Sequence, residues 1–472
     1  MRVLENLEPK KVFEYFEDLC MIPHGSGNTK QISDYCVDFA KKHGLSYTQD
    51  EWNNVIIRKN ASKGYENSPT VILQGHLDMV CEKDSGVSID FLKDGLNLSL
   101  DGDFVSAKGT TLGGDDGIAV AMALCVLDDD SLLHPPIEVL FTTDEETGMY
   151  GAAGLQTSLL KGKILINIDS EDEGVLTAGC AGGARAEIKK SVHFDEIKGT
   201  KKIVISGLVG GHSGVEIHKN RYNANKLMAE LLSRIPHFQL ANIAGGAKDN
   251  VIPNECECTL STDCDLDEII NDFIKDKKNS ADPNLKITVT DGEESPVTDE
   301  ESSKQIVKLV CMLPNGVQTM NDQIPTLVQT SLNLGVLKIE NGSLLCTFSV
   351  RSSVNSEKEG VLKELSKIAK DFGADYSDHG HYPAWEYREN SPLREIMVKT
   401  FEELYGRKPM VDVIHAGLEC GFFCDKIDGL DAVSFGPDLF DIHTARERLS
   451  ISSVQRTYKY LCETLKNLVT AD

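Results

Sequence analysis

Apolar positions in the first 190 residues follow two different periodicities. Short apolar runs of strand length occur at 54–58, 71–74, 137–143 and 164–168. Helical spacing of apolar residues precedes and separates these runs, at 8–45, 117–127 and 151–160, with a break at 23–28. Alternating strands and helices predict an α/β fold, with a mostly parallel sheet and helices on both faces. An inserted stretch at 84–108 predicts a hairpin that turns at Asp101-Gly102.

The pattern changes after about residue 183. Strand-like runs at 202–206, 257–262 and 344–350 then accompany helical runs at 223–235 and 356–372, which predicts a separate α+β domain. Residues after 386 return to helix, strand (432–435) and a last helix (452–468). We therefore predict a first domain made of 1–187 and 386–472, interrupted by an inserted domain at 188–385.

Composition indicates a folded protein without a membrane segment. Hydrophobic residues make up 40% and charged residues 26% of the 472 positions, which is ordinary for a globular chain. The longest apolar run, 118–127, has ten residues, about half of a membrane span. The first residues lack the apolar segment of a secretory signal. We expect a cytoplasmic protein with no membrane partner.

Charge and cysteine usage narrow the class further. The net charge of −26 repels phosphate backbones, so we expect no nucleic-acid partner. The thirteen cysteines are an odd number without a C-x-x-C pair, which fits a reducing compartment. Cys256 and Cys258 could form a thiol metal clip, but we favour alternation in a strand as the explanation of their spacing.

Acidic and imidazole side chains follow the predicted strands at the points where each strand ends. In α/β sheets, functional sites collect at the carboxyl ends of strands, so these side chains should converge. Two imidazoles and three carboxylates suit a pair of zinc-like ions and leave two further carboxylates for proton transfer. The set consists of His76, Asp78, Asp115, Glu145, Glu146, Asp169 and His443.

Spacing assigns provisional roles within this set. His76 is expected to bind a metal while Asp78 orients its ring, and Asp115, in a glycine-rich turn, is expected to bridge two metals. Of the adjacent Glu145 and Glu146, we assign Glu146 to the metal and Glu145 to general base, although the reverse order stays open. Each feature alone has a structural explanation, such as a helix cap for Asp115. Together they predict a metal hydrolase.

Four segments resemble the co-catalytic zinc peptidases of the carboxypeptidase G and aminoacylase type. They are 75–83 (GHLDMVCEK), 109–117 (GTTLGGDDG), 142–148 (TTDEETG) and 210–214 (GGHSG), and the similarity extends from 22–24 to His443. The resemblance implies two Zn²⁺ ions, with Mn²⁺ or Co²⁺ as alternatives, and a cis peptide at 115–116. One metal would be held by His76 and Asp169 and the other by Glu146 and His443, with Asp115 as the bridge and with Asp78 and Glu145 as the catalytic acids.

The resemblance also implies roles for the inserted domain, which in this family acts as a lid and holds the homodimer contact. His212 is similar to the lid histidine that stabilises the oxyanion, from the same chain or across a dimer. Asn250 and Arg351 resemble residues that hold the substrate carboxylate. His415 and Glu419 are expected to contact substrate. The segment at 441–445 departs from the family pattern because it lacks the His-Ser-Pro that often follows the ligand, which leaves His443 itself as the ligand.

The predicted function is therefore hydrolysis of dipeptides, of the Xaa-His (β-Ala-His) type or a broader range, by a water activated between two metals. Two alternatives remain at this point. One is an amidohydrolase of N-acyl amino acids on the same scaffold. The other is a catalytically silent metal-binding protein, which would have no need of a spare base such as Glu145.

Overall fold

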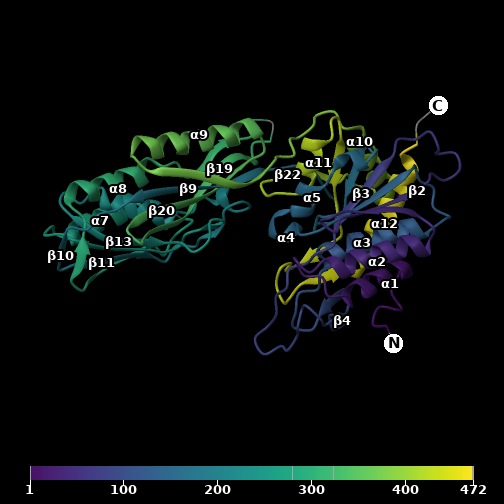
Figure 1. The fold of residues 1–472 in the computed structure, drawn as a ribbon, viewed down its shortest axis with the longest axis horizontal. Helices are drawn as coiled ribbons and strands as arrows, with labels where there is room; N and C mark the ends of the chain where they lie inside the picture. Colours follow the sequence, from purple (N-terminus) through teal and green to yellow (C-terminus); the bar gives the residue numbers. More distant parts are fainter. Residues whose placement is uncertain (1, 279, 323, 470–472) are drawn as a thin grey trace. The chain divides into compact units, whose positions relative to one another are not determined.

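The computed structural model describes residues 2–278, 280–322 and 324–469 and divides into two compact units (Figure 1). Unit 1 consists of Met1–Gly179, Tyr387–Val413 and Leu418–Asp472. Unit 2 consists of Cys180–Glu386 and Ile414–Gly417. The chain thus leaves unit 1 after its first 179 residues and returns to it near residue 387.

Unit 1 is built on an eight-stranded sheet with the order β1-β2-β6-β3-β7-β23-β8-β22. The central strands β6, β3, β7 and β23 run parallel, and antiparallel pairs occur toward the edges. The predicted fold class is confirmed. The strands are β1 (Ser46–Gln49), β2 (Val55–Lys59), β3 (Val71–His76), β6 (Ile137–Thr142), β7 (Ile164–Asn167), β8 (Val175–Cys180), β22 (Met410–Ile414) and β23 (Asp431–Ser434).

Both faces of this sheet are covered. In β3, Val71 and Leu73 belong to the main core cluster, whereas Ile72 points to the opposite face and is equally buried. Helix α3 packs on β3 and α1, and α11 packs on β23 and α5. The helices are α1 (Lys10–Cys20), α2 (Lys30–Lys42), α3 (Gly114–Asp128), α4 (Glu145–Gly148), α5 (Tyr150–Gly154), η1 (Thr157–Leu159), α10 (Pro392–Tyr405), α11 (Cys420–Lys426) and α12 (Ile451–Asn467).

The helix predicted at 151–160 is wrong in length. It is divided into α5 and the single 3₁₀ turn η1 because Leu155 and Gln156 adopt non-helical backbone angles, with ψ values of 131° and 99°. Periodicity alone did not reveal this interruption.

The predicted hairpin is present as β4 (Leu98–Asp101) and β5 (Phe104–Ala107), with Gly102 at φ 58° in its turn. Its partner is unexpected. Strand β25 (Arg448–Ser450) pairs with β5 and with β24 (Leu439–Phe440), which makes a four-stranded sheet. This pairing brings the loop that contains His443 back to the first part of unit 1.

Unit 2 is an α+β unit with a large antiparallel sheet in the order β16-β11-β15-β13-β19-β20-β9-β21, and β18 pairs with β19. Cys256 and Cys258 in β15 are buried while Glu257 between them is partly exposed, which confirms strand alternation. Helices α6, α8 and α9 pack on the sheet. The sheet strands are β9 (Gly182–Ser191), β11 (Lys201–Ser206), β13 (Gln239–Gly245), β15 (Cys256–Ser261), β16 (Lys286–Asp291), β18 (Gly316–Met320), β19 (Val328–Glu340), β20 (Ser343–Ser352) and β21 (Asp375–Tyr382).

The remaining elements of unit 2 are two short strand pairs and the helices. The strand pairs are β10 (Glu196–Lys198) with β17 (Ser295–Val297) and β12 (Gly211–His212) with β14 (Val251–Ile252). The helices are η2 (Ile217–Lys219), α6 (Ala224–Leu232), α7 (Leu266–Asp276), α8 (Glu300–Met312) and α9 (Asn355–Asp371).

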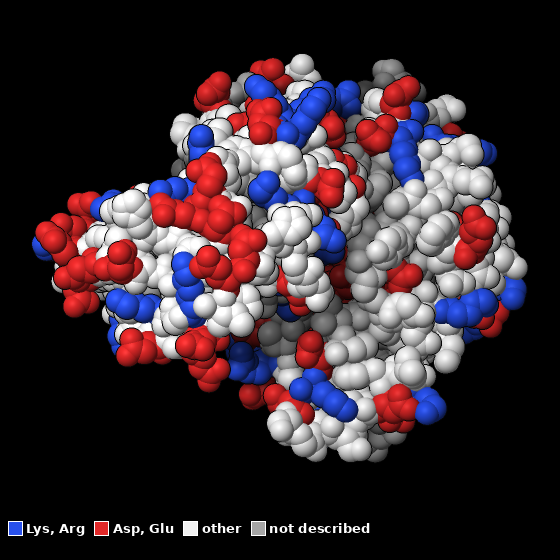
Figure 2. Space-filling model, turned by 60° about the vertical axis from the view of Figure 1, so that its left-hand side comes forward, with Lys and Arg blue, Asp and Glu red and all other residues white. Residues whose placement is uncertain are grey.

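The surface agrees with the acidic composition. Acidic side chains lie in several groups on the face shown in Figure 2, with basic side chains between them. Among the described residues, each helix is too short or too polar to cross a bilayer.

The core of unit 1 predicts a large effect of truncating Phe141 in β6, whose side chain is fully buried. Replacement by alanine removes the ring and leaves a cavity, so we expect Phe141→Ala to lower the free energy of unfolding by about 3–5 kcal/mol. Denaturant unfolding followed by circular dichroism measures the change. Leu92→Ala, at a side chain 65% exposed, is the control and should shift stability by less than about 0.5 kcal/mol. Equal effects of the two variants would contradict this packing.

Candidate metal centre

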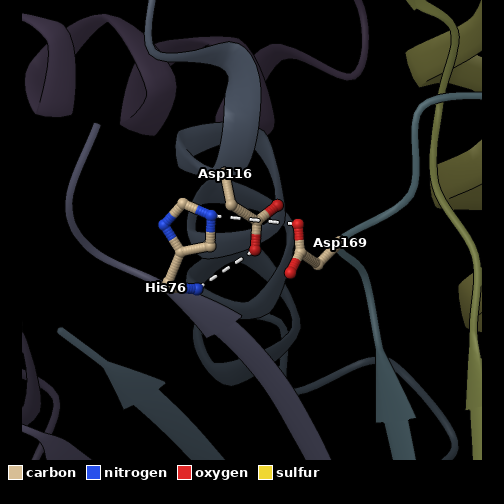
Figure 3. Close-up of side chains that lie close together, drawn as sticks. All are labelled: His76, Asp116 and Asp169. Carbon is tan, nitrogen blue, oxygen red and sulfur yellow. Dashed lines mark hydrogen bonds and ion pairs between the residues drawn. The ribbon is translucent and has the colours of Figure 1, made fainter. Parts of the chain in front are cut away.

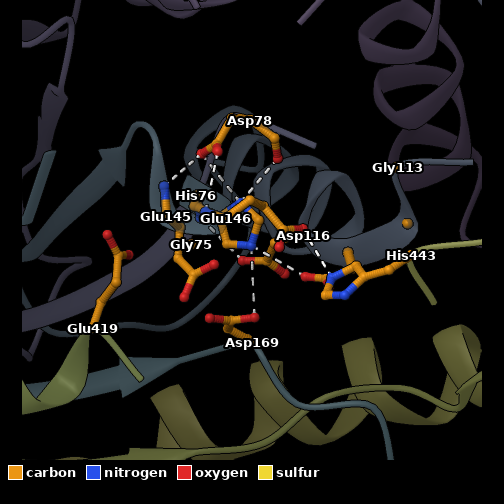
Figure 4. A network of polar contacts seen from close by, with 12 residues as sticks. Gly75, His76, Asp78, Gly113, Asp116, Glu145, Glu146, Asp169, Glu419 and His443 are labelled. Carbon is orange, nitrogen blue, oxygen red and sulfur yellow. Dashed lines mark hydrogen bonds and ion pairs between the residues drawn. The ribbon is translucent and has the colours of Figure 1, made fainter. Parts of the chain in front are cut away.

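Three neighbouring parallel strands deliver the predicted ligands to one edge of the sheet in unit 1. His76 is the last residue of β3, Glu146 lies in α4 just after β6, and Asp169 follows β7 by two residues. Because β6, β3 and β7 are adjacent and parallel, their carboxyl ends meet at this edge. Figure 4 shows these side chains pointing toward one another.

Asp115 lies between two imidazoles from distant parts of the chain. Its Oδ1 is 3.1 Å from His76 Nε2, and its Oδ2 is 3.1 Å from His443 Nε2. Neighbouring ligand atoms of a tetrahedral zinc, with bonds of about 2.0–2.1 Å, lie about 3.3 Å apart. Each side of this carboxylate is therefore spaced as a ligand pair, which is the geometry that a bridging carboxylate requires.

Glu146 and Asp169 each lie beside one of the two imidazoles that flank Asp115. Glu146 Oε1 lies 3.1 Å from His443 Nε2, yet this buried oxygen makes no aligned hydrogen bond among the described residues. Asp169 Oδ1 lies 3.8 Å from His76 Nε2. The ligand atoms of Asp115, Glu146 and His443 lie within 4.8 Å of one another. These distances fit two cations, one beside His76 and one beside His443.

Asp78 supports the ligands from behind. Its Oδ1 accepts the Glu145 N–H at 3.0 Å and its Oδ2 accepts the Ser26 hydroxyl at 2.8 Å. The Nδ1 atom of His76 lies 3.5 Å from Asp78 Oδ1 and 2.9 Å from the Asp78 carbonyl oxygen. A proton on Nδ1 leaves Nε2 as the metal-binding nitrogen. The backbone carbonyl of Asp78 is the nearer partner of His76 Nδ1, and an orienting role of the Asp78 carboxylate stays a prediction.

Burial and crowding of acids shape the electrostatics of the centre. Burial raises the pKa of the Glu145 carboxyl well above its ordinary value, and the neighbouring carboxylates Asp169, Glu419 and Glu146 add to the rise. Burial likewise raises the pKa of Asp169 to about 8. The close Asp115 and Glu146 carboxylates raise the pKa of His443 to about 11. Such a site stabilises positive charge between the acids.

Sequence reasoning missed Asp116. Its Oδ2 accepts the backbone N–H of His76 at 3.1 Å, and its ligand atom lies within 4.8 Å of those of His76 and Asp169 (Figure 3). The Asp115–Asp116 peptide is cis, as the family resemblance implied. The two adjacent aspartates at 115 and 116 were the only sequence signal, and the sequence analysis assigned a metal-binding role to Asp115 alone.

Glu447 was also missed. It lies under the turn that precedes α3, is 2% exposed and accepts the backbone N–H groups of Leu112, Gly113, Gly114 and Asp115. Burial raises the pKa of Glu447 to about 7, and these N–H groups oppose the rise. An acid 332 residues from Asp115 gives no sequence signal of this contact.

Glu419 lies beside the metal-ligand cluster within unit 1. Its Oε2 accepts hydrogen bonds from Gln74 and Thr142, both at 2.6 Å, whereas its buried Oε1 has no hydrogen-bond partner among the described residues. Burial raises the pKa of Glu419 to about 8. One oxygen of this carboxylate is thus fixed while the other is unsatisfied.

The other predicted substrate residues belong to unit 2. His212 is the last residue of β12 and pairs with Val251, the first residue of β14. Asn250 immediately precedes β14, and its backbone carbonyl accepts the Ser213 N–H at 2.9 Å. Arg351 in β20 donates to the Tyr382 hydroxyl at 3.1 Å.

The positive charge of Arg351 affects the pKa values of two histidines in unit 2. Burial lowers the pKa of His212, and burial lowers that of His415 to about 3, with the positive charge of Arg351 adding to both shifts. The His415 Nε2 atom is hydrogen-bonded to the Ser331 hydroxyl at 2.7 Å. The structure therefore brings His212, Arg351 and His415 into one electrostatic neighbourhood of unit 2.

Gly75 permits the close approach of Asp116 to His76. A Cβ atom at Gly75 would lie 2.6 Å from Asp116 Oδ2 and 2.9 Å from Ala119 Cβ. We expect Gly75→Ala to displace this contact and weaken metal binding by about 10- to 100-fold. Titration of the metal-free protein with zinc measures the affinity. Gly360→Ala in α9, where a Cβ meets open space, is the matched control and should bind zinc as the wild type does. Unchanged affinity in Gly75→Ala would show that this contact does not hold the ligand.

Comparison with known proteins agrees with this geometry. A family model described as peptidase family M20/M25/M40 matches residues 72–467. The chain is 36% identical to the cytosol non-specific dipeptidase of Escherichia coli (strain K12), over 99% of both chains. It is 35% identical to the crystal structure of an aminoacylhistidine dipeptidase from Vibrio alginolyticus, with a TM-score of 0.90 and coverage of 99% and 98%. An aminopeptidase structure from Bacillus cereus, at 15% identity and a TM-score of 0.58, shares the fold. The chain belongs to peptidase family M20/M25/M40, which confirms the resemblance found in its sequence.

Proposed function

We propose that the protein is a metal-dependent dipeptidase that uses two zinc ions. The observation on which this rests is the Asp115 carboxylate, whose two oxygens each lie 3.1 Å from a different imidazole. The names of the similar proteins, a non-specific dipeptidase and an aminoacylhistidine dipeptidase, support dipeptides as the substrate class. His76 and Asp169 would hold one ion, Glu146 and His443 the other, and Asp115 both.

Glu145 is the general base in this proposal. When bound, two zinc ions supply Lewis acidity and lower the pKa of water toward 7. Ligand atoms of His76, Glu145 and Glu146 lie within 4.8 Å of one another, so the Glu145 carboxylate is beside the metal ligands without being needed as one. It takes a proton from the attacking water and delivers the proton to the leaving amine. Asp78 holds the Glu145 backbone in place for this transfer.

His212 would stabilise the negative oxygen that develops on the substrate. Its Nδ1 accepts the N–H of Gly214 at 3.1 Å and that of Val215 at 3.3 Å. The neutral ring therefore has its proton on Nε2, and the lowered pKa keeps the ring neutral at pH 7. A neutral Nε2–H is a suitable oxyanion donor. The donor reaches substrate either in its own chain or across a dimer.

Arg351 would bind the substrate carboxylate. Its Nε–H is buried and lacks a hydrogen-bond acceptor among the described residues, and an unpaired buried guanidinium N–H favours an anionic ligand. Asn250 and His415 lie in the same unit and would line the same subsite. This requirement for a free carboxyl terminus suits an enzyme that cleaves dipeptides.

Glu419 would bind the substrate amino group. The Oε1 atom of Glu419 is buried and has no hydrogen-bond partner among the described residues. The Glu419 carboxylate lies close enough to Glu145 for its negative charge to raise the pKa of Glu145. A free ammonium group would give that oxygen both a hydrogen bond and a compensating charge. Recognition of both ends limits the substrate to short peptides.

We also propose a cytoplasmic location and a homodimer formed through unit 2, which acts as the lid. Both follow from the family resemblance and, for the location, from the name of the similar cytosol dipeptidase. Manganese or cobalt could replace zinc, because both accept imidazole and carboxylate ligands.

Glu145→Gln tests the proposed base. Loss of proton transfer should reduce kcat for dipeptides by about 100- to 10,000-fold, while two metals per chain remain bound. Steady-state kinetics and metal analysis measure the two properties. Glu51→Gln, at an exposed position, is the control and should keep full activity. Substantial turnover by Glu145→Gln with both metals in place would refute the assigned role.

Glu419→Gln tests recognition of the amino group. Removing a charged hydrogen-bond partner should reduce the preference for a dipeptide over its N-acetylated form by about 10- to 100-fold in kcat/KM, since such bonds contribute about 1.5–3 kcal/mol. Metal content should stay at the wild-type value. An unchanged preference would remove Glu419 from the substrate site.

Side-by-side assays separate the remaining functions. The proposed enzyme hydrolyses β-Ala-His and other dipeptides faster than N-acetyl amino acids, and chelation abolishes this activity until zinc, manganese or cobalt is restored. Faster hydrolysis of N-acetyl amino acids than of dipeptides would favour an N-acyl amino acid amidohydrolase. Failure to hydrolyse either class with each metal supplied would favour a silent metal-binding protein.

A further inference from the structure

The carboxylate of Glu447 is enclosed by backbone donors. Oε2 accepts from Leu112 at 2.8 Å and Gly113 at 3.2 Å, and Oε1 accepts from Gly114 at 2.8 Å and Asp115 at 3.4 Å. Because each oxygen already accepts two N–H groups, a proton on either oxygen would face a donor. The arrangement therefore suits the ionised side chain.

The turn has a backbone shape that concentrates these donors. Gly113 is left-handed at φ 67°, and Asp115 departs from helical angles with ψ 104°. Successive N–H groups in such a turn point to one side and form an anion-binding concavity. A Cβ atom at Gly114 would lie 2.6 Å from Leu439 Cδ2 and 3.3 Å from Glu447 Oε1, so the approach of Glu447 depends on glycine there.

Glu447 also belongs to the loop that holds His443. The Glu447 backbone N–H donates a hydrogen bond to the Thr444 carbonyl oxygen at 3.1 Å, and the Thr444 hydroxyl donates to the Asp441 carbonyl oxygen at 2.7 Å. Strand β25 begins at the next residue and pairs with β5. The same side chain thus connects the turn of Asp115 to the loop of His443, whose Nε2 lies 3.1 Å from Asp115 Oδ2.

We propose that Glu447 is a positioning residue of the two-metal centre, which fixes the Asp115 bridge relative to His443. The inference rests on the proposed function only in taking Asp115 and His443 as metal ligands. Glu447 is not among the residues proposed to bind metal or substrate. It acts through backbone N–H groups, so its removal loosens the spacing between two ligands rather than deleting either of them.

A metal titration of full-length variants tests this role. Glu447→Gln keeps the size of the side chain but replaces one acceptor oxygen by an NH₂ donor that faces backbone N–H groups. The matched control is Glu138→Gln. Glu138 is also 2% exposed and also accepts two backbone N–H groups, from Lys161 and Gly162, but it lies at the opposite end of β6 from Glu146.

We expect Glu447→Gln to bind zinc about 10- to 100-fold more weakly at the site of His443, and to alter the absorption spectrum of the cobalt-loaded protein. Glu138→Gln should bind both metals as the wild type does, even if its melting temperature falls. Wild-type affinity and spectrum in Glu447→Gln would overturn the proposal, and so would failure of the wild type to bind metal. A wild type that binds two metals but cleaves no dipeptide would refute the proposed function alone.

Amide hydrogen exchange of the metal-free wild type covers the case in which Glu447→Gln does not fold. The N–H groups at 112–114 should exchange at least about tenfold more slowly than unbonded loop amides, because Glu447 accepts their hydrogens. Exchange at the rate of free loops would show that the carboxylate does not hold this turn, and would overturn the proposal.

Discussion

The two-sided contact of Asp115 is the interaction on which the centre depends. One carboxylate faces His76 with one oxygen and His443 with the other, at 3.1 Å in each case. Two imidazoles that are 367 residues apart in the chain, at positions 76 and 443, are thereby related through a single side chain. The parallel strands, the glycine-rich turn and the β5–β25 pairing each serve to bring one part of this arrangement into place.

Crowding of acids at the sheet edge is costly unless positive charge offsets it. Burial raises the pKa values of Asp169 and Glu419 to about 8 and that of Glu145 well above its ordinary value. A folded chain tolerates such a cluster when cations or a cationic ligand share it. The buried acids of unit 1 therefore favour the binding of positive charge, which metal ions and an ammonium group can supply.

Much of this could be predicted from sequence because local signals were strong. Strand-length apolar runs that end one to three residues before His76, Glu146 and Asp169 predicted the sheet and the position of the acids at its carboxyl edge. The hairpin turn at Asp101-Gly102 was likewise a local signal. The assignment of lid residues such as His212 and Arg351 came from family resemblance, since an isolated histidine or arginine has no diagnostic pattern.

What could not be predicted depends on contacts between remote backbone and side-chain groups. The hydrogen bonds of Glu447 to residues 112–115 span more than 330 positions, and nothing in either segment specifies the other. Asp116 was not among the predicted site residues, and its hydrogen bond from the His76 backbone N–H joins positions 40 residues apart. The helix predicted at 151–160 was too long, because extended backbone at Leu155 and Gln156 interrupts a continuous apolar pattern.

The strand order of unit 1 has a consequence for how the chain is made. Strand β23 lies between β7 and β8, although it follows both by some 250 residues in the sequence. As a ribosome releases the chain from its amino end, β7 emerges with one edge unpaired, and all of 181–430 is synthesised before β23 arrives. The nascent protein must keep that open edge from pairing wrongly, or be shielded by a chaperone, until the missing strand is delivered.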